Sequence, residues 1–143
     1  MLTTEEIKRL IPHREPFLWV DEVVELDESS ILATKFLDPA LDIFKGHFPK
    51  HPVFPGVLQC EAAFQTGAIF IAKNGSLVEG KIPVVTRVKN VKFRKMIKPG
   101  DTMRISAQLI EQLANAYFMT AKVSVAGQVC TRLEFACASA EAE

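Results

Sequence analysis

The segment spanning residues 52–72 constrains the fold more than any other part of the chain. It consists almost wholly of apolar and small residues, and Glu61 is the one ionisable side chain within it. Two prolines, two glutamines and this glutamate interrupt the segment, so a buried central helix is favoured over a membrane span. We expect that helix to run from about residue 56 to residue 73, roughly 27 Å, and to end in a left-handed cap at Gly75.

Most of the remaining chain has the composition and alternation of β-strands. Residues 17–27 and 29–38 are rich in β-branched and aromatic side chains and predict a hairpin. Four further strands are expected after the helix. They lie near residues 82–95, 101–112, 116–126 and 128–139, and the last two are joined by a turn at Gly127.

The order of these elements predicts an α+β fold. A hairpin, one long apolar helix and then four strands imply a single antiparallel sheet wrapped around that helix, and 143 residues suit one domain over residues 1–143. A short first helix is expected after a capping box formed by Thr3 and Glu6. Because the long helix is apolar on nearly every face and one curved sheet cannot cover it completely, a second subunit is expected to lie on it.

The charge and cysteine content are those of an ordinary globular protein. The 17 basic and 17 acidic residues cancel, so bulk charge predicts neither a nucleic-acid nor a membrane partner. Three cysteines, an odd number without CxxC spacing, indicate a reducing compartment rather than a disulfide framework. The first residues mix acids and bases and lack the apolar core of a signal peptide, so we expect a cytoplasmic protein.

Glu61 and His47 are the candidate acid and base. Four prolines within residues 39–55 exclude regular structure there and would hold His47 in a rigid loop. Burial in an apolar helix, without a lysine or arginine one turn away, is expected to raise the pKa of Glu61 towards the working pH, so that it can deliver a proton. Gln65, one turn further on, shares its face and either orients the carboxyl group or binds the same ligand.

The start of the long helix is the candidate site for a polarised carbonyl. Its first N–H groups, at Gly56 and Val57, have no partner within the helix and carry a partial positive charge. The missing side chain of Gly56 also lets a substrate approach closely. With an acid and a base nearby, these donors suit abstraction of a proton next to a carbonyl. No metal is expected, because prolines exclude the helix that a His47–His51 metal pair would require.

Three stretches resemble a known enzyme family. GHFPKHPVFPGVLQCEAAFQ, residues 46–65, resembles the active-site signature of the 3-hydroxyacyl-acyl-carrier-protein dehydratases of fatty acid synthesis, which have the hotdog fold. IPHREPFLWVDEV and VKNVKFRKMIKPGD resemble two further motifs of the same family, so the likeness spans most of the chain.

The resemblance implies a mechanism without a metal or an organic cofactor. His47 would be the base that removes the C2 proton of a 3-hydroxyacyl thioester, and Glu61 would protonate the departing C3 hydroxyl. The Gly56 N–H would hold the thioester oxygen. In this family the histidine and glutamate of one site come from different subunits, which implies an obligate homodimer, often assembled as a trimer of dimers.

The sequence departs from the family pattern around the expected acyl entrance. Residues 84–90 replace the family's aromatic flap, Phe54 stands where methionine is usual, and Lys50 stands where glycine is usual. These positions border the substrate site that the resemblance implies, so the sequence leaves open both the acyl-chain length and the acyl pathway that the protein serves.

Residues 87–98 carry a run of basic side chains without an acidic one. The candidates for docking an acidic acyl carrier protein are Arg87, Lys89, Lys92, Arg94, Lys95 and Lys98. A local strip of this kind can steer such a partner although the whole chain is neutral. The alternative is an alternating strand with a solvated basic face. A nucleic-acid partner is less favoured, because Phe93 is the one aromatic residue among these basic side chains.

Two other functions are compatible with these residues. A hotdog thioesterase would use Glu61 as nucleophile or base towards water, although the retained His47 weighs against it. A non-catalytic acyl-binding or carrier-docking module would leave this pair without a role. Release of free thiol would favour the first, and carrier binding without turnover would favour the second. Of the other polar candidates, His13 is expected to fix a turn, and Cys60 is expected to belong to the core.

Overall fold

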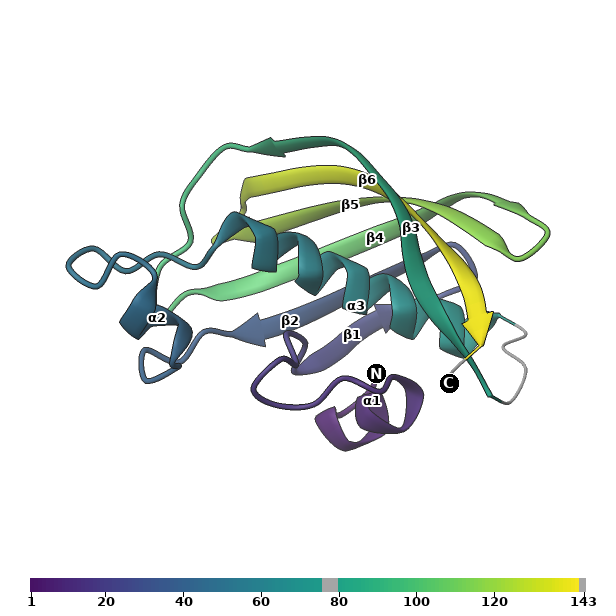
Figure 1. Cartoon of the computed structure of the whole chain (residues 1–143), viewed down its shortest axis with the longest axis horizontal. Coiled ribbons are helices and arrows are strands. Elements are labelled where there is room, and N and C mark those ends of the chain that lie inside the picture. Colours follow the sequence, from purple (N-terminus) through teal and green to yellow (C-terminus); the bar gives the residue numbers. More distant parts are fainter. Residues whose placement is uncertain (76–79, 142–143) are drawn as a thin grey trace.

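A long helix lying against one curved antiparallel sheet dominates the computed structural model, which describes residues 1–75 and 80–141 (Figure 1). The helices are α1 (Thr4–Leu10), α2 (Ile43–Gly46) and α3 (Gly56–Asn74). The strands are β1 (Glu22–Leu26), β2 (Ser30–Phe36), β3 (Lys81–Phe93), β4 (Thr102–Leu113), β5 (Ala116–Val125) and β6 (Gln128–Glu141). Their order in the sheet is β1-β2-β4-β5-β6-β3. The predicted six-stranded sheet around one helix is confirmed.

Local sequence signals fix the ends of several elements. At the start of α1 the Thr3 side chain accepts from the Glu6 N–H and the Glu6 carboxylate accepts from the Thr3 N–H, each at 3.2 Å, so the capping box is confirmed. Between β5 and β6, Ala126 and Gly127 have φ values of 50° and 80°. Two consecutive positive φ values suit a two-residue hairpin turn, and the predicted turn at Gly127 is therefore also confirmed.

The predicted left-handed cap at Gly75 is wrong. Gly75 has a φ of −90° and a ψ of 171°, which is extended backbone, and its N–H donates to the Ile71 carbonyl at 2.6 Å. Close packing explains the glycine instead. A Cβ at this position would lie 2.5 Å from the Ile71 carbonyl oxygen and 2.7 Å from the Tyr117 hydroxyl. The glycine at this helix end is therefore explained by its close contact with Ile71 and with Tyr117 of β5, and not by a positive φ.

The core lies between α3 and the inner face of the sheet. Ile69 and Phe70 of α3 are almost fully buried, as are Ile105 of β4 and Leu133 of β6. Burying each such side chain stabilises the fold by about 1.5–3 kcal/mol. One stripe of α3 has less cover. Val57, at its start, is 73% exposed, and Glu61 and Phe64 further along the same face are partly exposed.

The strand β3 forms one edge of the sheet and contacts α3 (Figure 1). It is 13 residues long, and Val85, Val88 and Phe93 on it are large apolar side chains with substantial exposure. A long edge strand with exposed apolar side chains is a ready surface for pairing with another chain. Of the helices in the described ranges, none is both long and apolar enough to cross a bilayer.

Gly67 provides a sharp test of the packing between α3 and the sheet. A Cβ there would lie 2.8 Å from Cζ of Phe135 and 3.3 Å from Sδ of Met119. Replacing glycine by alanine within a helix ordinarily stabilises it, but here the new methyl group would push against the sheet. We expect Gly67→Ala to lower the free energy of unfolding by about 1–3 kcal/mol in urea denaturation.

Gly46 is the matched control, because a Cβ at that position meets nothing within 4 Å. We expect Gly46→Ala to change the free energy of unfolding by less than about 0.5 kcal/mol or to raise it slightly. A stabilising Gly67→Ala would contradict the described contact between α3 and β6.

Candidate active site

Glu61 lies in the second turn of α3, on the stripe that the sheet leaves partly open. Its side chain is 23% exposed. The Gln65 side-chain amide donates to Glu61 Oε2 at 3.1 Å, and His13 Nε2 lies 3.7 Å from the same oxygen. Both neighbours thus approach Oε2, which leaves Oε1 as the carboxyl oxygen without a protein partner among the described hydrogen bonds.

The Gln65 amide links Glu61 to the segment that includes Phe17 and Trp19. Gln65 is fully buried, and its Oε1 accepts from the Trp19 N–H at 2.8 Å. Its Nε2 donates to the Phe17 carbonyl at 2.8 Å and to Glu61 Oε2. Both amide hydrogens and the oxygen are therefore engaged. Of the two roles that the sequence left open, orientation of the carboxyl group is the one that the geometry supports.

The expectation that residues 39–55 hold no regular structure is wrong for residues 43–46, which form the short helix α2 in the stretch between Pro39 and Pro49 that has no proline. His47 caps this helix and begins the proline-rich loop before α3. Its N–H donates to the Ile43 carbonyl at 3.1 Å, and its ring stacks on Phe48 with centroids 4.3 Å apart. Nδ1 lies 2.7 Å from the Val53 carbonyl oxygen. Because a carbonyl can only accept, this contact assigns the proton to Nδ1 and leaves a lone pair on Nε2. In the neutral ring Nε2 is therefore the nitrogen that can accept a proton.

The two candidate catalytic residues are not in contact within one subunit. Among the hydrogen bonds and ion pairs of the described residues, none joins His47 to Glu61. Each instead contacts its own local framework, a loop carbonyl for His47 and the Gln65 amide for Glu61. The two candidate residues of one subunit thus lie apart, and among the hydrogen bonds of residues 1–75 and 80–141 each has a side-chain atom without a partner.

Gly56 and Val57 begin α3, where Pro55 is the N-terminal cap residue. The first N–H groups of a helix have no intrahelical partner and can point at an oxygen ligand. The Phe93 ring lies over Gly56, because a Cβ there would be 2.7 Å from Phe93 Cε1. Phe54 is buried rather than at an entrance: its ring packs 5.1 Å from that of Trp19.

The six basic candidates are all exposed. They do not form one surface, because they line different grooves and contact different neighbours. Arg87 and Lys89 line a small groove of about 220 Å³, and Lys89 lies 4.0 Å from Glu134. Lys95 contacts the Gln128 side chain. Lys98 lies beyond the end of β3, in the segment that leads to β4.

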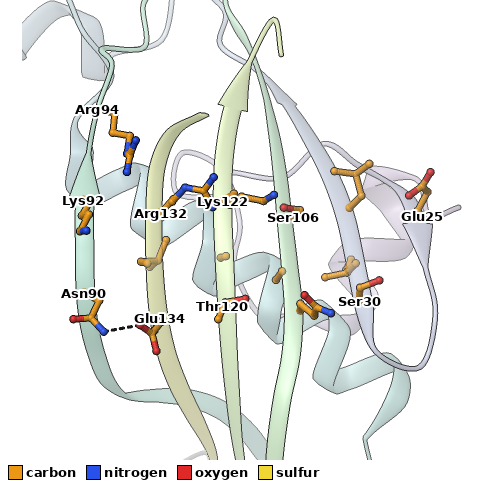
Figure 2. A pocket seen from close by; sticks show the side chains of 16 residues that line it. Glu25, Ser30, Asn90, Lys92, Arg94, Ser106, Thr120, Lys122, Arg132 and Glu134 are labelled. Carbon is orange, nitrogen blue, oxygen red and sulfur yellow. Dashed lines mark hydrogen bonds between the residues drawn. The ribbon is translucent and has the colours of Figure 1, made fainter. Parts of the chain in front are cut away.

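Lys92 and Arg94 line a larger groove of about 770 Å³ on the outer face of the sheet (Figure 2). Sequence reasoning missed two basic residues beside them. Lys92 is the register partner of Arg132 on β6, and Arg132 is the register partner of Lys122 on β5. Three like charges thus stand opposite one another on three neighbouring strands, an arrangement that costs stability. Counting outward from the predicted Gly127 turn would have placed Lys122 and Arg132 near one another.

The three cysteines supply no reactive group for this site. All are free and buried. Burial raises the pKa of Cys60, the neighbour of Glu61, and raises the pKa of Cys137 to about 12. A thiol with a raised pKa holds little thiolate at neutral pH and is a poor nucleophile. The expectation that Cys60 belongs to the core is confirmed.

The sheet wrapped around α3 defines the chain as a hotdog-fold protein. A chain of the dehydratase heterocomplex ApeI:P from Xenorhabdus doucetiae has this fold, with a TM-score of 0.79, 14% identity, and coverage of 94% of this chain and 91% of that one. A thioesterase from Haemophilus influenzae aligns with a TM-score of 0.70 and 18% identity, covering 99% and 92% of the two chains. These likenesses establish the fold.

The chain belongs to the FabA-like family, because residues 11–134 match the family model described as a FabA-like domain. A 3-hydroxyacyl-[acyl-carrier-protein] dehydratase FabZ from Rickettsia bellii is 44% identical over 131 residues, which cover 91% of this chain and 90% of the relative. The enzyme of the same name from Clostridium perfringens is 40% identical over 129 residues, covering 90% and 92%. The family assignment made from the three sequence stretches is confirmed.

Gln65→Leu tests the role of the buried amide. The change leaves the Trp19 N–H and the Phe17 carbonyl without their partner, and an orphaned buried polar group costs about 1–3 kcal/mol. We expect urea denaturation to show a loss of that size or larger. Thr66→Val is the control on the same helix, because the Thr66 hydroxyl donates only to Ala62 within α3. Equal stability losses in the two variants would refute the orienting network.

Proposed function

We propose that the protein removes water from 3-hydroxyacyl thioesters borne on an acyl carrier protein, giving trans-2-enoyl thioesters. The observation that carries this proposal is the hydrogen bonding of the two candidate residues, His47 and Glu61, each of which has one side-chain atom held by a neighbour. Within the described part of the chain, one ring nitrogen of His47 has no hydrogen-bond partner, and Glu61 has one carboxyl oxygen without a partner beside one that accepts from Gln65. A base and an acid prepared in this way suit the removal of a proton and a hydroxyl group from adjacent carbons.

His47 is the base in this proposal. With Nδ1 committed to the Val53 carbonyl, Nε2 takes the proton from C2 of the substrate. The Nδ1–H contact also stabilises the imidazolium that forms, because a charged donor strengthens a hydrogen bond to a carbonyl. The electrons of the broken C2–H bond form the new double bond between C2 and C3.

Glu61 is the acid. As the C3–O bond breaks, the proton held on Oε1 passes to the departing hydroxyl group, which leaves as water. Oε2 stays bonded to the Gln65 amide throughout, so the carboxyl group keeps its orientation in both protonation states. At the end of the step Glu61 is ionised and His47 is protonated. Loss of the His47 proton to solvent and uptake of a proton by the Glu61 carboxylate together reset the site.

The start of α3 supplies the third element of the site. The N–H groups of Gly56 and Val57 would hold the thioester oxygen, on which negative charge develops when the C2 proton leaves. Phe93, 55% exposed, covers Gly56 and would close this end of the site from water. Phe54, which is buried against Trp19 and Phe44, would support this end of the site from within the core.

A second copy of the chain would complete the site. The less covered stripe of α3 carries Val57, Glu61 and Phe64, and the adjoining edge strand β3 has exposed apolar side chains and unpaired backbone groups. Pairing of two β3 edges would cover both stripes at once, and it would bring His47 of one subunit towards Glu61 of the other. The proposed assembly is a homodimer with shared sites, which the family resemblance extends to a trimer of dimers.

The carrier would dock on the basic surface at the β3 edge. Lys92, Arg94, Lys122 and Arg132 form its centre on the outer face, beside a groove of about 770 Å³ (Figure 2). Arg94 follows Phe93, which covers the start of α3 from the inner side. An acidic partner held there would lie close to the end of β3 at Phe93, and its substrate arm would pass this end of the strand to reach Gly56. A cytoplasmic location belongs to the same proposal, supported by three unpaired thiols.

Glu61→Gln is the first test of the roles. The amide is nearly isosteric and can keep the contact with Gln65, but it cannot donate a proton as an acid does. We expect the fold to be retained and turnover to fall by about 100-fold or more. Turnover is measured from the absorbance of the enoyl-thioester product. His47→Ala should lose activity to a similar degree. Near-full activity in either variant would overturn the assignment, and free thiol in place of enoyl product would indicate a thioesterase.

Mixing the two inactive variants tests whether sites are shared between subunits. A dimer with one His47→Ala subunit and one Glu61→Gln subunit has one site with both residues intact if the sites are shared, and none if each site lies in a single subunit. After joint unfolding and refolding, we expect activity of roughly a quarter of the wild-type level. Activity no higher than that of the separate variants would refute the shared site.

The docking surface is tested by neutralising Lys92 and Arg132 together. We expect Lys92→Gln with Arg132→Gln to raise KM for a carrier-borne substrate by about 10-fold and to weaken its salt dependence, because two charges that attract the carrier are lost. KM for the same acyl group on a small thiol should not change. Lys73→Gln, an exposed change away from this surface, is the control. Equal effects on both substrates would contradict docking at this surface.

A further inference from the structure

The contact between His13 and Glu61 joins two segments far apart in the chain. His13 lies in the loop after α1, and its Nε2 is 3.7 Å from Glu61 Oε2. This is the oxygen that also accepts from the Gln65 amide. A separation of 3.7 Å is within the range of an ion pair but longer than a hydrogen bond, and a small rotation of either side chain would bring the two atoms to hydrogen-bond distance.

The surroundings of His13 keep its ring neutral. Nδ1 is buried and has no hydrogen-bond partner among the described residues. A protonated ring would place an N–H without an acceptor at that buried position, which is costly. Burial lowers the pKa of His13, the neighbouring Arg14 lowers it further, and only Glu61 opposes them. The neutral ring with its proton on Nε2 avoids the orphaned donor and aims its one N–H at the carboxylate.

We propose that His13 is a positioning residue for the proposed dehydration, and that it holds Oε2 of Glu61 as a second neutral donor while Oε1 faces the substrate. The proposal rests on the proposed function for its catalytic meaning, but the contact itself can be tested without turnover.

The absence of charge on the His13 ring matters for the chemistry of Glu61. A lysine or arginine in this place would hold Glu61 as an anion and remove the proton that the acid must deliver. A neutral donor fixes the direction of the carboxyl group and leaves it able to carry that proton. Gln65 and His13 approach Oε2 from different segments, one from the same helix and one from the loop before β1. Together they would prevent rotation of the carboxyl group, which one donor alone would permit.

The test compares His13→Phe, which fills the space without a donor, with His13→Gln, whose amide nitrogen can occupy the place of Nε2. With a carrier-borne substrate, we expect His13→Phe to lower kcat by about 10- to 100-fold with little change in KM. The basic limb of its kcat–pH profile should move to higher pH, because the carboxylate loses a donor that favours the ionised form. His13→Gln should restore most of kcat and the position of the limb.

Arg14→Ala separates positioning from a loosened loop. The Arg14 guanidinium donates to the carbonyls of Lys8, Ile11 and His13, so its loss loosens the same loop without touching Glu61. We expect this variant to lower the melting temperature while the basic limb stays in place. A pH profile of His13→Phe that matches the wild-type profile, or one that Arg14→Ala reproduces, would overturn the proposal.

A second readout does not depend on activity. The Glu61 carboxyl carbon, labelled with ¹³C and assigned by its disappearance in Glu61→Gln, can be titrated by NMR in each variant. We expect its titration midpoint to rise in His13→Phe and to stay at the wild-type value in His13→Gln and Arg14→Ala. An unchanged midpoint in His13→Phe would refute the contact. Failure of the wild-type enzyme to produce enoyl thioester would instead refute the proposed function, and the NMR result would still decide the contact.

Discussion

Packing of α3 against the inner face of the sheet is the interaction on which the rest of the structure depends. The sheet covers most of the helix so closely that Gly67 is needed for its approach to Phe135. The cover stops at one stripe, where Val57, Glu61 and Phe64 stay partly accessible. The same packing therefore stabilises the fold and decides which face of the helix can carry chemistry. A carboxyl group at Ala62, Ala63 or Ala68 would lie in the core.

Within one subunit the candidate site consists of separately held side chains and does not form a closed pocket. Among the described residues, hydrogen bonds engage one atom of each candidate group, Nδ1 of His47 and Oε2 of Glu61, and the other atom has no partner. The partners that hold these atoms are neutral, a backbone carbonyl on one side and an amide on the other. Such partners fix direction without fixing charge, which suits groups that must change protonation state in each cycle. The uncovered helix stripe and the free β3 edge then explain why a second subunit is proposed to close the site.

Local patterns in the sequence predicted the fold well. Strand alternation, the capping box at Thr3 and the turn at Gly127 depend on neighbours in the chain, and all three are confirmed. The cap at Gly75 was wrong, because a glycine needed for close packing against β5 has the same sequence signature as one needed for a positive φ. Contacts between distant segments escaped prediction for a related reason. Nothing local to His13 shows that its ring faces Glu61, and the charges of Lys122 and Arg132 join those of β3 only through strand register.

The central claim is that His47 and Glu61 remove water reversibly from C2 and C3 of a thioester whose thioester bond stays intact. Isotope exchange tests this claim most directly. A 3-hydroxyacyl thioester is equilibrated with the protein in H₂¹⁸O and analysed by mass spectrometry. Reversible dehydration predicts ¹⁸O in the C3 hydroxyl group with the thioester bond preserved, because water lost from C3 returns from solvent. Appearance of ¹⁸O in a free carboxylate together with released thiol, or no exchange at all, would contradict the account.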